Sequence, residues 1–139
     1  MIEKKPELPT DAELSFGPDL AVLPIRNAVL FPGAVAPFDV GREKSVALVE
    51  EVTAESNPVI AIFTQKDPSV DDPAGTDLYP VGCAARVLKA LKHSSGNYSL
   101  ILQGLTRIRL EEMTGREPFL RARVARVEAQ STADVEAEA

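Results

Sequence analysis

The sequence has no tryptophan, few aromatic residues, one cysteine and one histidine among its 139 positions. Because Cys83 has no partner cysteine, the chain cannot form an internal disulfide and does not need an oxidising compartment. His93 and one cysteine cannot supply the three or four converging ligands of a metal site. The carboxylates in "DDPAGTD" lack the ligand spacing of a calcium loop. We therefore expect no metal or cofactor site in this chain, and we expect Cys83 to be a small buried hydrophobe.

Long apolar runs are also absent. The charged start "MIEKKPELPTDAEL" has no apolar segment of the kind found in a secretory signal. The longest apolar runs elsewhere are far shorter than a membrane span. These absences predict a cytoplasmic protein without a membrane partner.

Basic residues are outnumbered by acidic ones, 15 to 21, and the formal net charge is −6. This charge repels nucleic acid unless a basic patch concentrates locally. One candidate patch lies in the C-terminal third: Arg107, Arg109, Arg116, Arg121, Arg123 and Arg126. No aromatic residues alternate with these arginines to stack on bases, which argues against nucleic-acid binding. We expect solvated strand faces and ion pairs with Glu111, Glu112 and Glu117 instead.

The remaining composition, 45% hydrophobic and 26% charged, is typical of one folded domain. Residues 1–19 are polar and interrupted by proline and glycine, which predicts a flexible leader. The folded lobe is expected over residues 20–129. The small acidic residues of 130–139 predict a tail or the start of a linker to further domains.

Within the lobe, the pattern predicts short strands and one helix. Strands are predicted at 20–26, 35–40, 59–63, 81–92, 98–110 and 119–127. A helix is predicted over about 42–55, with one buried stripe formed by Ser45, Leu48, Val49 and Val52. Pro24 and Pro37 cannot donate to a ladder, so their strands should be edge strands or irregular. Gly104 predicts a bulge or bend in the longest strand. The fold class is therefore α+β, with a β-rich, barrel-like sheet and one packed helix.

The stretch "PFDVGREKS" ends on a Lys44–Ser45 pair, as a phosphate-binding loop does. Such a loop would need glycines at 38 and 43, where this chain has Phe38 and Glu43. A Ser45–Lys44 nucleophile pair is also disfavoured, because adjacent helical residues point about 100° apart. We expect no catalytic residue in this chain.

The segment "VLFPGAVAPF" gathers apolar residues around two prolines and a glycine: Leu30, Phe31, Val35 and Phe38. A proline-broken segment cannot bury every side chain, so part of this set is expected at the surface. Exposed apolar patches commonly mark contact sites. The alternative is that these residues fill the mouth of the barrel.

Two long stretches resemble a known family. "LAVLPIRNAVLFPGAVAPFDVGREKSVALVEE" and "QKDPSVDDPAGTDLYPVGCAARVLKALKHSSGNYSLILQGLTRIRL" closely resemble the N-terminal substrate-binding domain of the ATP-dependent protease Lon. The shared motifs include the L-P-[LI]-R-[ND] start, the P-[FL]-x-V-G-R-x-[KR]-S helix entry and the following helix. The resemblance covers about residues 20–129. Gly33, Ala34 and Asp39 depart from bulkier residues that are frequent in the family, which makes the patch less apolar.

The resemblance implies a PUA-like pseudo-barrel with one helix packed across it. It implies a non-catalytic domain that recognises unfolded or tagged proteins and supports a homohexamer. In a whole Lon protease an ATPase module and a Ser–Lys peptidase domain follow, and neither is in this sequence, so the chain is expected to be a fragment. ATP and magnesium are expected only in that ATPase module.

On this basis, substrate is expected to contact the apolar residues Leu30, Phe31, Val35, Pro37 and Phe38. The charged helix entry, Arg42, Glu43 and Lys44, is expected to frame that contact. Two alternatives remain open. The domain could be an assembly module that pairs subunits through strand edges or the arginine-rich face, or a stand-alone Lon-domain adaptor without an ATPase.

Overall fold

The computed structural model describes residues 16–55 and 58–127. The expected leader therefore lies outside the described residues except for 16–19, and the end of the lobe and the acidic tail lie outside them entirely. The described elements are β1 (Asp19–Ile25), β2 (Val35–Val40), α1 (Glu43–Val52), β3 (Val59–Thr64), the short 3-10 helix η1 (Gly75–Asp77), β4 (Val81–Lys92), β5 (Tyr98–Gly115) and β6 (Arg121–Arg126).

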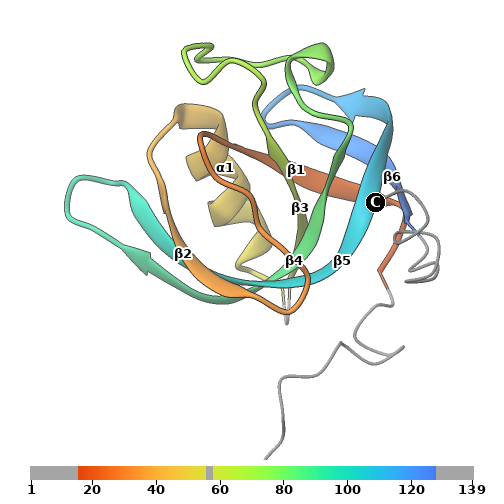
Figure 1. The fold of residues 1–139 in the computed structure, drawn as a ribbon. Coiled ribbons are helices and arrows are strands. Elements are labelled where there is room, and N and C mark those ends of the chain that lie inside the picture. The colour runs from red at the N-terminus through yellow and green to blue at the C-terminus, as the bar shows by residue number, and fades with distance from the viewer. Residues whose placement is uncertain (1–15, 56–57, 128–139) are drawn as a thin grey trace, which may run out of the picture.

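The strands form one sheet in the order β2-β5-β4-β3-β1-β6, and a further pairing of β5 with β6 closes five of them into a barrel. The pair β1–β3 is parallel, and every other pair in the sheet is antiparallel. Strand β2 stands outside the closed ring and pairs with β5 alone. Figure 1 shows α1 on the concave side of the curved strands β2, β4 and β5. The predicted barrel-like α+β fold is confirmed.

Two apolar cores lie on opposite faces of β1 and β3, because successive strand residues point to opposite sides. On β3, Ile62 belongs to the core that packs against α1, whereas Ala61 and Phe63 belong to the core inside the barrel. The helix contributes its predicted stripe to the first core, and Ser45, Leu48, Val49 and Val52 are all buried. The helix is shorter than expected at both ends, Glu43–Val52 against 42–55, and the Thr53 hydroxyl caps it by donating to the Val49 carbonyl at 2.7 Å.

The bulge that the sequence predicted at Gly104 is present, and there β5 passes from one core to the other. The register between β4 and β5 shifts there, leaving Leu105 as an extra residue. Before this bulge Leu100 faces the helix-side core, and beyond it Ile108 faces the barrel core. The second half of β5 pairs with β6, which extends β5 to Gly115 rather than ending it at 110.

Both strand prolines lie at positions where the sheet needs no backbone hydrogen-bond donor. Pro37 lies in β2, which is an edge strand as expected. Pro24 lies in β1, an inner strand, but β6 pairs only with Asp19–Ala21 at the other end of β1. The Val22 amide donates to the Leu120 carbonyl on the β6 side of β1. Because backbone groups two residues apart point to the same side of a strand, the nitrogen of Pro24 also points to the β6 side, beyond the paired region.

Candidate functional site

An apolar face covers the outer side of β2, β5 and β4, opposite the helix-side core. Residues paired across antiparallel strands point to the same face. The register places Val35 beside Gln103, and Pro37 beside Ile101. On β4, the exposed apolar side chains are Leu88, at a second bulge, and Leu91, opposite Ser99. We call Val35, Pro37, Ile101, Leu88 and Leu91 the outer face; Val35, Leu88 and Leu91 are 56%, 48% and 49% exposed.

Phe31 lies in the turn that leads into β2 and is 52% exposed. A turn closed by a hydrogen bond from the Ala34 amide to the Phe31 carbonyl brings the residue next to the start of β2. The turn is fixed to β5, because the Gly33 amide donates to the Gly104 carbonyl at 2.9 Å. The guanidinium of Arg107 lies 5.8 Å from the centroid of the Phe31 ring, a cation–π distance.

Two of the five apolar residues predicted to contact substrate do not belong to this surface. Leu30 is only 5% exposed and belongs to the helix-side core. Phe38 packs against the same core, because it alternates with the outward-facing Pro37 along β2. The prolines and the glycine of this segment obscured the alternation of a β-strand, so the sequence did not show which side chains point inward. Phe31, Val35 and Pro37 are exposed as expected.

Three members of the outer face were missed by the sequence prediction. Ile101 alternates with the buried Leu100 and Leu102 in "YSLILQG", and this alternation was the signal that could have identified it. Leu88 and Leu91 follow no regular alternation because of the bulge in β4. Their proximity to β2 comes from pairing between distant segments, which the sequence does not display.

The helix entry does not frame the outer face. Arg42 donates to the side-chain oxygen of the buried Gln65 and, at 2.8 Å, to the carbonyl of Pro24. Burial, and secondly the charge of Arg26, lower the pKa of the Arg42 guanidinium below its ordinary value. Gln65 in turn donates to the Val70 carbonyl at 2.9 Å, so Arg42 tethers the loop between β3 and β4 to the helix.

Lys44 forms an ion pair with the same loop. Its ammonium lies 3.0 Å from Asp72 and 3.1 Å from Glu117, and hydrogen bonds to these carboxylates raise its pKa. Glu43 is exposed beside it, and these residues line a hollow of about 290 Å³ at the helix start. Arg42 also lines a second hollow of about 500 Å³, together with Pro37 and its neighbours on β2. The helix entry thus holds a loop in place, and of its three charged residues Arg42 is the one that lines this second hollow.

His93, Ser99 and Asp39 form a hydrogen-bonded chain at the turn end of the β4–β5 hairpin. The Ser99 hydroxyl donates to Asp39 at 3.1 Å and lies 2.7 Å from Nε2 of His93. In a catalytic triad the carboxylate holds the histidine, whereas Asp39 contacts the serine, so this order is not that of a catalytic triad.

The arginines of the C-terminal third lie on β5, on its neighbour β6 and in the connection between them. Two of them form ion pairs, Arg121 with Asp19 at 3.1 Å and Arg123 with Glu112 at 2.8 Å. The Arg123–Glu112 pair confirms one of the predicted partners. Arg107 instead lies over Phe31, as described above. The ion pairs of Arg121 and Arg123 place a carboxylate beside two of these six arginines.

The described part of the chain contains no helix with the length and apolar character needed to span a membrane. The family model of the ATP-dependent protease La (LON) substrate-binding domain matches residues 19–139. The chain belongs to this family. The Lon protease of Anaeromyxobacter dehalogenans (strain 2CP-C) is 46% identical over 121 residues, which are 86% of this chain and 14% of that protein. Lon protease 2 of Sorangium cellulosum (strain So ce56) is 42% identical over 118 residues, 85% of this chain and 15% of that protein.

This Lon domain thus spans about 15% of the length of the curated relatives that it matches. Among solved structures, the N-terminal domain of Mycobacterium avium complex Lon protease matches with a TM-score of 0.63 at 21% identity, covering 86% of this chain and 60% of that one. A Lon N-terminal domain protein from Xanthomonas campestris matches with a TM-score of 0.59 at 21% identity, covering 81% and 62%. At this identity the likeness concerns the fold, and it agrees with the expected β-rich architecture.

Proposed function

We propose that this chain is the substrate-recognition domain of a cytoplasmic Lon protease and that its outer face, with Phe31, binds unfolded or damaged polypeptides. The observation that supports this most strongly is the exposure of adjacent apolar side chains on β2, β5 and β4. Unfolded chains expose apolar side chains of the same kind, and contact removes apolar area from water on both partners.

Binding by one domain is weak, because the apolar gain from a small patch must offset the cost of association and of ordering the substrate. Several domains in one hexamer raise the overall affinity through effective concentration. Weak contacts at each domain also let the substrate leave for the ATPase and peptidase domains. In this proposal, ATP, magnesium and peptide hydrolysis belong to those domains and not to this chain.

The test is a titration of the isotope-labelled 139-residue chain with reduced casein as an unfolded protein, followed by backbone amide shifts. Shifts are expected at Val35, Ile101 and Leu91 and in the turn after Phe31. A variant with Phe31→Ser and Val35→Ser is expected to weaken binding.

The matched control is Val81→Ser, because Val81 is an exposed valine, 39% accessible, at the other end of β4. Casein affinity in this control should match that of the unsubstituted chain. Equal affinity in all three proteins would reject this placement of the site. If sedimentation also showed a stable oligomer with the outer face protected, the domain would be an assembly module instead.

A further inference from the structure

The hollow of about 290 Å³ at the helix start lies where strands β1 and β6 separate. Their pairing ends at Ala21, and the Val22 amide then donates to the Leu120 carbonyl at 2.9 Å. Pro24 has no amide proton, so it cannot extend this pairing. The start of α1 and the loop between β3 and β4 enclose the hollow on the unpaired side of β1.

The walls of this hollow are apolar. Residues of both cores and of the loop contribute to them, and all five are buried: Val22, Pro24, Pro73, Phe119 and Leu120. Walls of this kind favour an apolar side chain, because its burial removes apolar area from water on both sides of the contact.

One end of the hollow is formed by hydrogen-bond donors that lack acceptors. The amides of Glu43, Lys44 and Ser45 lie in the first turn of α1 and have no acceptor in the described part of the chain. The N-cap residue Arg42 forms no side-chain cap. Ser45 lines the hollow and is only 6% exposed, and its hydroxyl forms no hydrogen bond with another described residue. Because an unpartnered buried hydroxyl costs free energy, this end favours a ligand with an acceptor oxygen.

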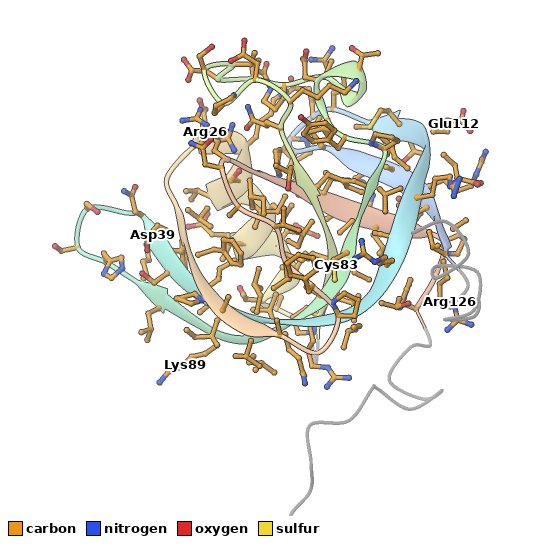
Figure 2. All side chains as sticks on the ribbon, in the orientation of Figure 1. Arg26, Asp39, Cys83, Lys89, Glu112 and Arg126 are labelled. Atoms are coloured by element: carbon orange, nitrogen blue, oxygen red, sulfur yellow. The ribbon has the colours of Figure 1, made fainter. Side chains whose placement is uncertain are left out.

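The charged side chains around the hollow are largely paired with one another, and carboxylates are in excess. They are three cations and four carboxylates: Arg26, Arg42, Lys44, Glu43, Asp71, Asp72 and Glu117. Lys44 lies between Asp72 and Glu117, and Arg26, just beyond β1 in Figure 2, lies 3.2 Å from Asp71. The positive end of the α1 dipole, equivalent to about half a charge, offsets only part of this excess. The acceptor that suits the site is therefore a neutral carbonyl rather than a carboxylate.

We propose that this hollow binds an internal residue of an unfolded polypeptide, with its apolar side chain between the walls and its carbonyl oxygen at the start of α1. An unfolded segment can present a carbonyl in this way, whereas the carbonyls of helices and sheets are already bonded. The site goes beyond the proposed function, because none of the five outer-face residues lines this hollow.

The test uses N-acetyl-leucine N′-methylamide, which carries one apolar side chain and neutral carbonyls. Backbone amide shifts of the isotope-labelled 139-residue chain report its binding, and they are expected at Lys44, Ser45 and Leu120. The glycine analogue lacks the side chain and should bind about tenfold more weakly. N-acetyl-leucine, which ends in a carboxylate, should also bind more weakly than the methylamide, and this difference should shrink at about 0.5 M salt.

Ser45→Ala removes the unpartnered hydroxyl. Because no hydrogen bond within the fold is lost and alanine favours helices, the urea midpoint should stay the same or rise. Binding of the leucine methylamide should nevertheless weaken about threefold. Ser94→Ala is the matched control, since Ser94 is an exposed serine in the connection between β4 and β5. It should change neither the midpoint nor the binding.

A lower urea midpoint for Ser45→Ala with unchanged binding would show that the hydroxyl serves the fold, and it would overturn this site. Equal binding of the leucine and glycine methylamides would overturn it as well. Tighter binding of N-acetyl-leucine would overturn the choice of an internal residue.

The variant with Phe31→Ser and Val35→Ser separates this site from the outer face. It should weaken casein binding and leave binding of the leucine methylamide unchanged. Loss of methylamide binding in this variant would place the ligand at the outer face and reject the hollow as its site. Unchanged casein binding would reject the proposed function at the outer face and leave the hollow intact.

Discussion

The carbonyl oxygen of Phe31 lies directly against Gly104, and a Cβ on that glycine would stand 2.2 Å from it. The Gly104 amide also donates to the Ala34 carbonyl at 2.8 Å. Real side chains do not tolerate such a contact, so glycine is what allows the turn to cross β5 here. The position of Phe31 on the surface therefore depends on a residue in the middle of β5.

Gly104→Ala is expected to lower the free energy of unfolding by about 1–3 kcal/mol, because the added methyl group must displace backbone atoms of the turn. Urea unfolding measures this loss. The same variant should also weaken the binding of casein, since Phe31 moves with the turn. Gly17→Ala is the control, because nothing lies within 4 Å of a Cβ at that position. Unchanged urea midpoints for both variants would contradict the close crossing.

Arg42→Ala is expected to destabilise the fold by about 1–3 kcal/mol, because it leaves the buried Gln65 side chain and the Pro24 carbonyl without their donor. Arg42→Lys keeps the charge but lacks the planar fork that serves two acceptors, so it should recover little of the loss. Urea unfolding measures both variants. Full recovery by lysine would show that charge, rather than the hydrogen-bond geometry, is what matters at this position.

Cys83 is expected to resist thiol reagents in the folded chain. Burial raises the pKa of its thiol from 9.0 to about 11, so the reactive thiolate is scarce at pH 8. Labelling with iodoacetamide should be slow in buffer and fast in denaturant. A Leu88→Cys thiol, on an exposed part of β4, is the control and should react in the folded chain. Equal rates for the two thiols would contradict the burial of Cys83.

The raised pKa of Cys83 also makes the free energy of unfolding depend on pH. The folded chain keeps the Cys83 proton at pH values where the unfolded chain has lost it, because its pKa is higher when folded. The contribution is therefore fully present below about pH 9 and declines as the pH rises towards about 11. Cys83→Ala should remove this part of the decline in a series of urea unfolding curves. Parallel curves for both proteins across this range would refute it.

Periodicity was enough to predict the strands and the helix, because local patterns decide which side chains are buried. The stripe of α1 and the bulge at Gly104 are both of this kind. The surface was harder to predict. Phe38 and Leu30 turned inward through an alternation that prolines obscured, and Leu91 reached the outer face only through pairing of β4 with β5. The loop contacts of Arg42 connect segments far apart in sequence, so no local pattern reveals them.

Pro37 protects the open edge of β2. The Gly104 amide donates to Ala34, so alternation turns positions 34, 36, 38 and 40 towards β5 and position 37 towards the open edge. A proline there removes a donor that another strand would need, and open edges otherwise promote pairing between chains.

Pro37→Val restores this donor and adds a residue that favours strands, so we expect more self-association than in the unsubstituted chain. Sedimentation velocity over a concentration series would show it as a rising sedimentation coefficient. Pro24→Val is the control. Pro24 also faces an unpaired side, but its carbonyl accepts from Arg42, so no continuous edge is exposed there. Equal sedimentation of all three proteins would mean that the side chains of the outer face, and not the missing donor, keep β2 from pairing with another copy.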